Sequence, residues 1–199
     1  MAPWLVAGLG NPGPAYATHR HNVGAMVVDA LARRARASFT SPRLMRAEVA
    51  QTRLTASGIG GVGADAQQVV LLKTRTYMNE SGLPVKKAAA FFTIDPAHLV
   101  VVHDELDLEF GRLRLKLGGG DNGHNGLRSI RAHLGTGDFH RVRFGIGRPP
   151  GRQDPADFVL SPFPASLREE LALGIERAAD AVEVLIGRGL VEAQNRFNS

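Results

Sequence analysis

Two histidines and one carboxylate are the side chains of this sequence best suited to moving protons. His19 and His21 lie just before a segment with helical spacing, and Asp104 follows an aliphatic run at 99–102. Histidine exchanges a proton near neutral pH, and a neighbouring carboxylate can fix its tautomer and stabilise the imidazolium. The sequence has no cysteine and no Gly-x-Ser-x-Gly motif of the kind that presents a nucleophilic serine. If a histidine and Asp104 form a pair, we therefore expect the nucleophile to be water.

The same residues also have simpler interpretations. A lone histidine is more often a satisfied residue of the surface or core, and Asp104 could be a solvated turn residue. His19 and His21 could instead be two metal ligands, but alternate positions in a loop are a weak signal and no third ligand lies nearby in the sequence. We therefore expect no metal at these histidines.

Asparagines follow two of the expected strands. Asn11 comes after the apolar run at 4–9, and Asn79 comes before a helix. Neutral amides in these places suit a site that binds amide or carbonyl groups, although Asn79 could equally be a helix N-cap. The glycines at 8–13 match Gly-x-Gly-x-x-Gly, the fingerprint of dinucleotide-binding proteins. We reject that interpretation because the prolines among them continue the turn, whereas the fingerprint opens directly into a helix that holds the pyrophosphate.

A glycine-rich loop at 116–126 is the most unusual segment. It lacks the Gly-Lys-Ser/Thr of a P-loop, which disfavours hydrolysis of nucleoside triphosphates. Its glycines allow a ligand to approach the backbone closely, although they could simply form a mobile loop. Lys116, Arg141 and Arg143 lie near the loop in the sequence or on the following strand, and they could neutralise phosphates.

The basic residues are unevenly distributed. The chain has 24 Lys and Arg against 19 Asp and Glu, a net charge of +5. Residues 1–150 hold 19 basic and 11 acidic side chains, a net +8, whereas residues 151–199 hold 5 and 8, a net −3. A positive body favours a polyanion such as nucleic acid. Every candidate site residue lies within that body.

Strands that alternate with helices must position these residues. We expect strands at 4–9, 48–55, 68–74, 98–103, 112–117 and 141–146, and helices at 23–36, 81–92, 127–134 and 167–190. This order predicts the α/β class, as a single three-layer αβα domain over residues 1–199 with a twisted mixed β-sheet. In such sheets the site lies beyond the carboxyl ends of the strands. The apolar runs are too short to cross a bilayer and no secretory leader is visible, so we expect a soluble cytoplasmic protein.

Six sequence blocks together resemble the bacterial peptidyl-tRNA hydrolase family. They occur in the family's order and are GLGNPG at 8–13, Tyr16 with RHNVG at 20–24, YMNESG at 77–82, HDELD at 103–107, GHNGL at 123–127, and FHRVR at 139–143 with GIG at 145–147. The resemblance implies a monomeric, cofactor-free α/β hydrolase that cleaves the ester between a peptide and the 3′ ribose of tRNA. Its partner would be peptidyl-tRNA, with no membrane involved.

The resemblance also assigns roles to residues. It implies that His21 is the catalytic base, that Asp104 is its partner, and that Lys116 and Arg143 clamp a tRNA phosphate. It places six further residues around the ester, the peptide and the tRNA 3′ end, namely Asn11, Met78, Asn79, Asn125, Tyr16 and His124. Of these, it implies that Asn11 is catalytic and that Asn125 also holds water. The family usually has Thr directly before Arg-His-Asn, whereas this chain has His19. A non-catalytic RNA-binding protein on the same scaffold is the alternative, and retention of every site residue argues against it.

Overall fold

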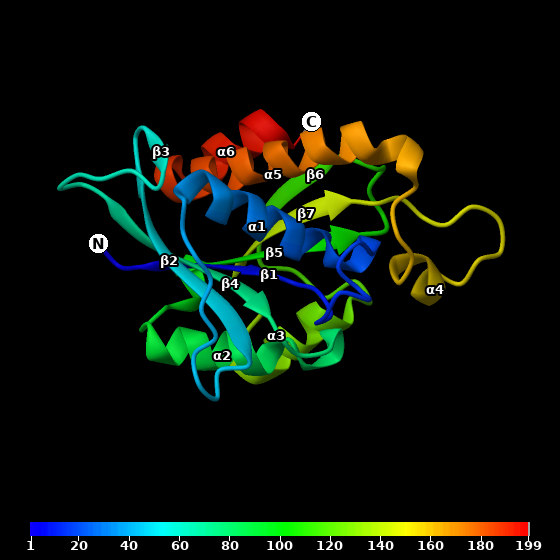
Figure 1. The fold of residues 1–199 in the computed structure, drawn as a ribbon, viewed down its shortest axis with the longest axis horizontal. Helices are drawn as coiled ribbons and strands as arrows, with labels where there is room; N and C mark the ends of the chain where they lie inside the picture. The colour runs from blue at the N-terminus through cyan, green and yellow to red at the C-terminus, as the bar shows by residue number, and fades with distance from the viewer. Residues whose placement is uncertain (199) are drawn as a thin grey trace.

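The computed structural model describes residues 1–198 and is built on one seven-stranded sheet with the order β3-β2-β4-β1-β5-β7-β6 (Figure 1). The four central strands are parallel, namely β1 (Trp4–Gly8), β4 (Gln67–Thr74), β5 (Leu99–Glu105) and β7 (His140–Gly145). The remaining strands are antiparallel to their neighbours, namely β2 (Ala47–Thr55), β3 (Gly58–Ile59) and β6 (Leu113–Leu117). The sheet is therefore mixed, as the sequence predicts.

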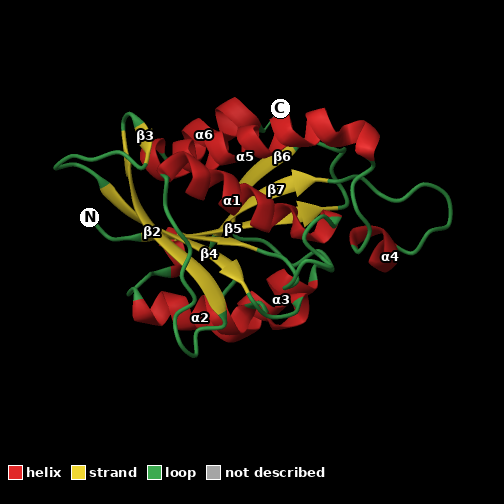
Figure 2. Ribbon diagram, viewed as in Figure 1, coloured by secondary structure: helices red, strands yellow, loops and turns green. Residues whose placement is uncertain are grey.

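Helices cover both faces of the sheet (Figure 2). One face carries α1 (Val23–Ala35), α5 (Arg168–Arg188) and α6 (Leu190–Phe197), and the other carries α2 (Gly82–Phe91) and α3 (Asn125–Leu134). The short α4 (Pro155–Val159) lies beyond the carboxyl ends of the central strands, at the right of Figure 1. Single 3-10 turns are η1 (Arg20–Asn22), η2 (Met78–Glu80), η3 (Pro96–His98) and η4 (Ala165–Leu167). The predicted three-layer αβα fold is confirmed.

Alternation along the central strands produces two apolar cores. Because successive side chains of a strand point to opposite faces, Val100 and Val102 of β5 pack with α1 and α5, whereas Leu99 and Val101 pack with α2 and α3. All four of these side chains are buried. Burial on both faces explains why β5 is an uninterrupted aliphatic run in the sequence.

Close backbone contact holds α1 against the sheet. A Cβ added at Gly24, in the first turn of α1, would collide with the carbonyl oxygen of Val102, and one added at Gly8 would collide with the carbonyl oxygen of Gly24. The two glycines therefore let α1 lie directly on β1 and β5. This contact brings η1, which immediately precedes α1, to the end of β5.

The structure corrects several predicted boundaries. β5 continues through Asp104 and Glu105, and α3 begins two residues before the predicted Leu127. The predicted helix at 167–190 ends near Gly189, whose φ is 93°, and α6 follows it. β3, α4 and α6 are absent from the sequence prediction. Within residues 1–198, no helix combines the length and apolar character needed to span a membrane.

Candidate active site

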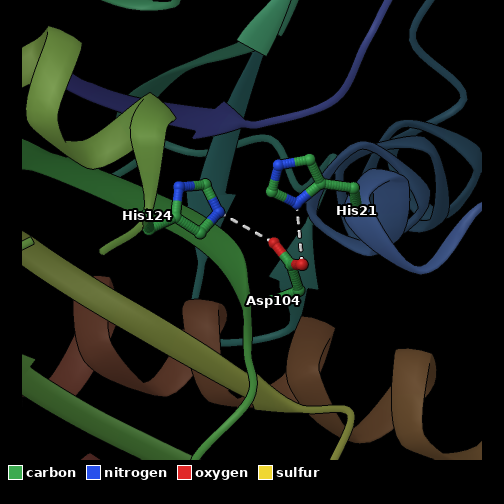
Figure 3. A group of neighbouring side chains, drawn as sticks. All are labelled: His21, Asp104 and His124. Carbon is green, nitrogen blue, oxygen red and sulfur yellow. Dashed lines mark hydrogen bonds and ion pairs between the residues drawn. The ribbon is translucent and has the colours of Figure 1, made fainter. Parts of the chain in front are cut away.

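Asp104 binds two histidines at once, at the end of β5. Its Oδ2 lies 2.8 Å from His21 Nδ1, and its Oδ1 lies 2.8 Å from His124 Nε2. Figure 3 shows the two rings converging on the carboxylate, His21 from η1 and His124 from the residue before α3. The Asp104 side chain is 2 % exposed. Both of its oxygens therefore accept a hydrogen bond away from bulk water.

The second nitrogen of His124 determines its tautomer. His124 is the N-cap of α3, and its Nδ1 accepts hydrogen bonds from the backbone N–H groups of Gly126 (3.1 Å) and Leu127 (3.4 Å). A ring nitrogen that accepts carries no proton, so neutral His124 has its proton on Nε2 and donates it to Asp104. Protonating Nδ1 would break the cap and place a positive charge at the positive end of a helix. The cap thus fixes His124 as a donor to Asp104 through Nε2.

The environment shifts the pKa values of Asp104 and His21 in opposite directions. Burial favours the neutral carboxyl, but the two histidines outweigh it and hold the pKa of Asp104 well below its usual range. Burial also disfavours the imidazolium of His21, yet the charge of Asp104 and its hydrogen bond together raise the pKa of His21 above the ordinary value of 6.5. Asp104 is therefore a carboxylate at neutral pH, and it increases the basicity of His21.

His21 keeps one nitrogen free for chemistry. Because Asp104 is ionised, His21 Nδ1 donates to it, and neutral His21 then has an unprotonated Nε2. In Figure 3 that nitrogen points away from Asp104. His21 lines a cleft of about 460 Å³ and its side chain is 12 % exposed, enough for water to reach it. The arrangement suits a general base.

The same three side chains have ligand atoms within 4.8 Å of one another, the spacing of a possible metal site. A metal on His124 Nε2 would require the proton to move to Nδ1, which faces two backbone N–H donors. That tautomer would leave three donors facing one another at the start of α3. The donor set therefore fits a hydrogen-bonded triad better than a divalent cation.

Asn11 is held rigidly beside the triad. The side chain of Asn22 brackets its backbone, with Oδ1 accepting from Asn11 N (3.0 Å) and Nδ2 donating to Asn11 O (2.9 Å). Asn11 Oδ1 accepts from the backbone N–H of Met78 at 2.7 Å. Because that N–H can only donate, the side-chain oxygen of Asn11 faces Met78 and its NH₂ group faces the cleft that Asn11 lines. The cleft thereby gains a fixed neutral donor.

The cleft gathers every predicted catalytic and substrate-binding residue. It is lined by Asn11, Tyr16, His21, Met78, Asn79, Asp104, His124 and Asn125. Asn79 lies within η2, so the alternative that it caps a helix is wrong. His19 is not part of the triad; its ring instead packs edge-on against Tyr16. These residues therefore meet in one cleft beyond the carboxyl ends of the strands, where the strand-end rule places them.

Sequence reasoning missed one wall of the cleft. The side chains of Pro155, Ala156, Val159 and Leu160, in and after α4, line it and are mostly apolar. Arg20, next to His21, holds this segment because its Nη1 donates to Ser161 Oγ (2.5 Å) and its guanidinium stacks on Phe158 at 3.9 Å. The expectation that residues 151–199 carry no part of the site is therefore wrong. Asp154 before Pro155 is a helix-start signal that could have revealed α4.

Tyr77 is a further lining residue that the sequence prediction left out. It is 57 % exposed and packs edge-on against Tyr16, with ring centroids 6.2 Å apart. These are the only two tyrosines of the chain. The mouth of the cleft therefore has an aromatic rim.

The predicted phosphate-binding cations lie outside the cleft, on β6 and β7. Arg143 is not free, since its Nη2 donates to Glu105 Oε1 at 2.9 Å. Burial lowers the pKa of Lys116, with Arg143 and Arg141 acting in the same direction and Glu105 opposing them. Arg141, which the sequence also offers as a phosphate ligand, is 1 % exposed, and its guanidinium binds backbone carbonyls instead. Of the three cations, Lys116 and Arg143 remain accessible.

Three comparisons relate the chain to known proteins. A family model described as Peptidyl-tRNA hydrolase matches residues 5–199. The chain is similar to a peptidyl-tRNA hydrolase of Cutibacterium acnes, with 62 % identity over all of both chains, and to one of Streptomyces coelicolor, with 54 % identity over 100 % of this chain and 96 % of that protein. Among solved structures it is similar to peptidyl-tRNA hydrolase from Acinetobacter baumannii, with a TM-score of 0.86 and 35 % identity over 99 % of this chain and 95 % of that one.

Proposed function

The chain belongs to the peptidyl-tRNA hydrolase family and is an ester hydrolase, and we propose that His21 activates the water that cleaves peptidyl-tRNA. The bond broken would be the ester between the peptide and the 3′ ribose of tRNA. The observation that carries this proposal is the orientation of His21, whose Nδ1 is committed to buried Asp104 while Nε2 faces the cleft.

The proposed reaction needs one base and neutral hydrogen-bond donors. Water held near Asn125 attacks the ester carbonyl as His21 Nε2 takes its proton, and the carbonyl oxygen becomes an oxyanion. The NH₂ groups of Asn11 and Asn79 stabilise that oxyanion. The carbon–oxygen bond to the ribose then breaks, and His21 returns the proton to the leaving 3′ oxygen. A well-positioned base of this kind contributes about 10²–10⁴-fold.

Substrate recognition divides between the cleft and the basic strands. We assign the tRNA 3′ end to the rim at Tyr16, and a tRNA phosphate to Lys116 and Arg143. Phosphate contacts set affinity and position without reading sequence, which suits an enzyme that accepts many tRNAs. We also propose that the enzyme acts as a monomer in the cytoplasm, where translation supplies its substrate.

Substitution of His21 tests the proposal directly. His21→Ala is expected to abolish hydrolysis of a model peptidyl-tRNA while keeping the wild-type dissociation constant for tRNA. His19→Thr, two residues away and outside the triad, is the matched control and should retain turnover. Near-normal hydrolysis by His21→Ala would overturn the assignment, and failure of the wild-type protein to release peptide would favour an RNA-binding protein without catalysis.

A further inference from the structure

Arg141 is a buried cation without a carboxylate partner among residues 1–198. Its guanidinium donates to the backbone carbonyls of Gly119 (2.8 Å), Gly137 (3.0 Å) and Gly120, and it packs over the ring of Phe139 at 4.5 Å. Its Nε is buried and has no hydrogen-bond partner in the described part of the chain. Three carbonyls of two separate loops therefore converge on one side chain.

Burying this charge is unfavourable for the fold. Burial, aided by Arg131 and Arg143 and opposed by the more distant Asp121 and Asp138, lowers the pKa of Arg141 to about 10, so the group still carries its proton at neutral pH. A buried charge that no ion pair compensates destabilises a protein. The hydrogen bonds of this guanidinium fix the backbone of Gly119 and Gly120, in the glycine loop 118–120, to a residue of β7.

That loop is the surface on which the Lys116 ammonium rests. Gly119 has φ 105°, and a Cβ built on it would lie 2.6 Å from Lys116 Nζ and 3.1 Å from Cε. Lys116 also faces Arg141 across the β6–β7 ladder. The peptide that Arg141 binds through its carbonyl is thus the one against which Lys116 packs.

We propose that Arg141 is a positioning residue that seats the Lys116 ammonium for contact with a tRNA phosphate. The inference rests on the proposed function, in which Lys116 binds phosphate. Arg141 is enclosed and does not touch the ligand; it acts through Gly119. A lysine held in one conformation before binding loses less side-chain freedom when the phosphate arrives, which favours affinity.

The test measures tRNA affinity as a function of salt concentration. Lys116→Met should weaken binding about three- to tenfold at 0.1 M salt and reduce the slope of log K against log salt by about one. Arg141→Lys keeps the net charge but cannot reach three carbonyls, so it should produce the same two changes. The loss should appear in KM and not in kcat. Arg53→Lys, on the exposed part of β2 at the far side of the sheet, is the matched control with no expected effect.

A double variant separates positioning from general damage to the fold. In the Lys116→Met background, Arg141→Lys should cost little further affinity, because the residue it positions is already gone. The same loss in both backgrounds would overturn the inference, as would a wild-type salt slope in Arg141→Lys. An unchanged slope in Lys116→Met would instead show that the proposed phosphate contact itself is wrong.

Gly119→Ala keeps the test decisive if Arg141→Lys fails to fold. It keeps the guanidinium but adds a methyl group 2.6 Å from Lys116 Nζ, at a backbone position whose φ of 105° also disfavours a side chain. It should therefore show the same reduced salt slope. Wild-type tRNA affinity and a wild-type salt slope in a folded Gly119→Ala protein would refute the contact between Gly119 and Lys116 on which the inference depends.

Discussion

Asp104→Asn should reverse the tautomer of His21. Because His124 can only donate from Nε2, the oxygen of Asn at position 104 must face His124. Its NH₂ group then lies where Oδ2 was, 2.8 Å from His21 Nδ1. An NH₂ group donates, so Nδ1 must accept, and the proton of His21 moves to Nε2. The base would then present a proton to the water that it has to deprotonate.

The magnitude follows from the cost of the alternative arrangement. Turning the amide round would place two donors against each other at His124, and an unsatisfied buried donor costs about 1–3 kcal/mol. The productive tautomer is thereby depleted by roughly one to two orders of magnitude, and the charge that stabilises the imidazolium is lost as well. We expect kcat to fall by about 10²–10⁴-fold, the contribution of a general base. Single-turnover hydrolysis of a model peptidyl-tRNA measures it.

A second substitution tests the reasoning itself. In Asp104→Asn combined with His124→Asn, the shorter side chain still caps α3 but no longer donates to position 104. The amide can then turn its oxygen to His21, and kcat should rise about tenfold above that of Asp104→Asn alone, with His124→Asn as control. A double variant no faster than Asp104→Asn, or Asp104→Asn retaining more than about a tenth of wild-type kcat, would refute the argument.

Three further outcomes are expected. Only the neutral form of His21 is a base, and Asp104 raises the pKa of His21. We therefore expect kcat/KM to fall as the pH drops through a pKa above 6.5. In Asp104→Asn this fall of kcat/KM should occur at lower pH. Asn11→Asp keeps an acceptor for the backbone N–H of Met78 but replaces the donor in the cleft with a negatively charged oxygen. We therefore expect kcat to fall about 10²–10³-fold with an unchanged thermal unfolding curve. A wild-type kcat would rule out an oxyanion contact. Gly24→Ala should push α1 away from β5 and destabilise the protein by about 1–3 kcal/mol, seen as a lower Tm, and an unchanged Tm would contradict the close contact.

The fold could be predicted because its signals are local. The aliphatic run of β5 and the glycines and prolines after β1 mark strand ends, and parallel strand ends meet at one edge of a sheet. That rule brings Asn11 and Asp104 to the same edge, and the close contact of Gly24 with β5 places His21 beside them. The predicted helix at 167–190 agrees with α5 to within two residues at each end, whereas α6, which follows Gly189 directly, was not predicted.

The electrostatic pattern of the site could not be predicted, because it depends on which atoms meet. In the sequence, Arg141 and Arg143 are alternate arginines of one strand and look equivalent. The structure buries the first among carbonyls and pairs the second with Glu105. His124 likewise appeared to be a residue that flanks the crevice, and only its two backbone donors reveal which tautomer it adopts.

The cap on α3 connects the glycine loop with His21 through a series of hydrogen bonds. The glycine loop that carries the Lys116 seat runs within a few residues into His124, which is bonded to Asp104, which is bonded to His21. No other helix or strand intervenes along this path. One short stretch of backbone, residues 119–124, therefore carries both the contact of Gly119 with Lys116 and the N-cap that orients His124 toward Asp104.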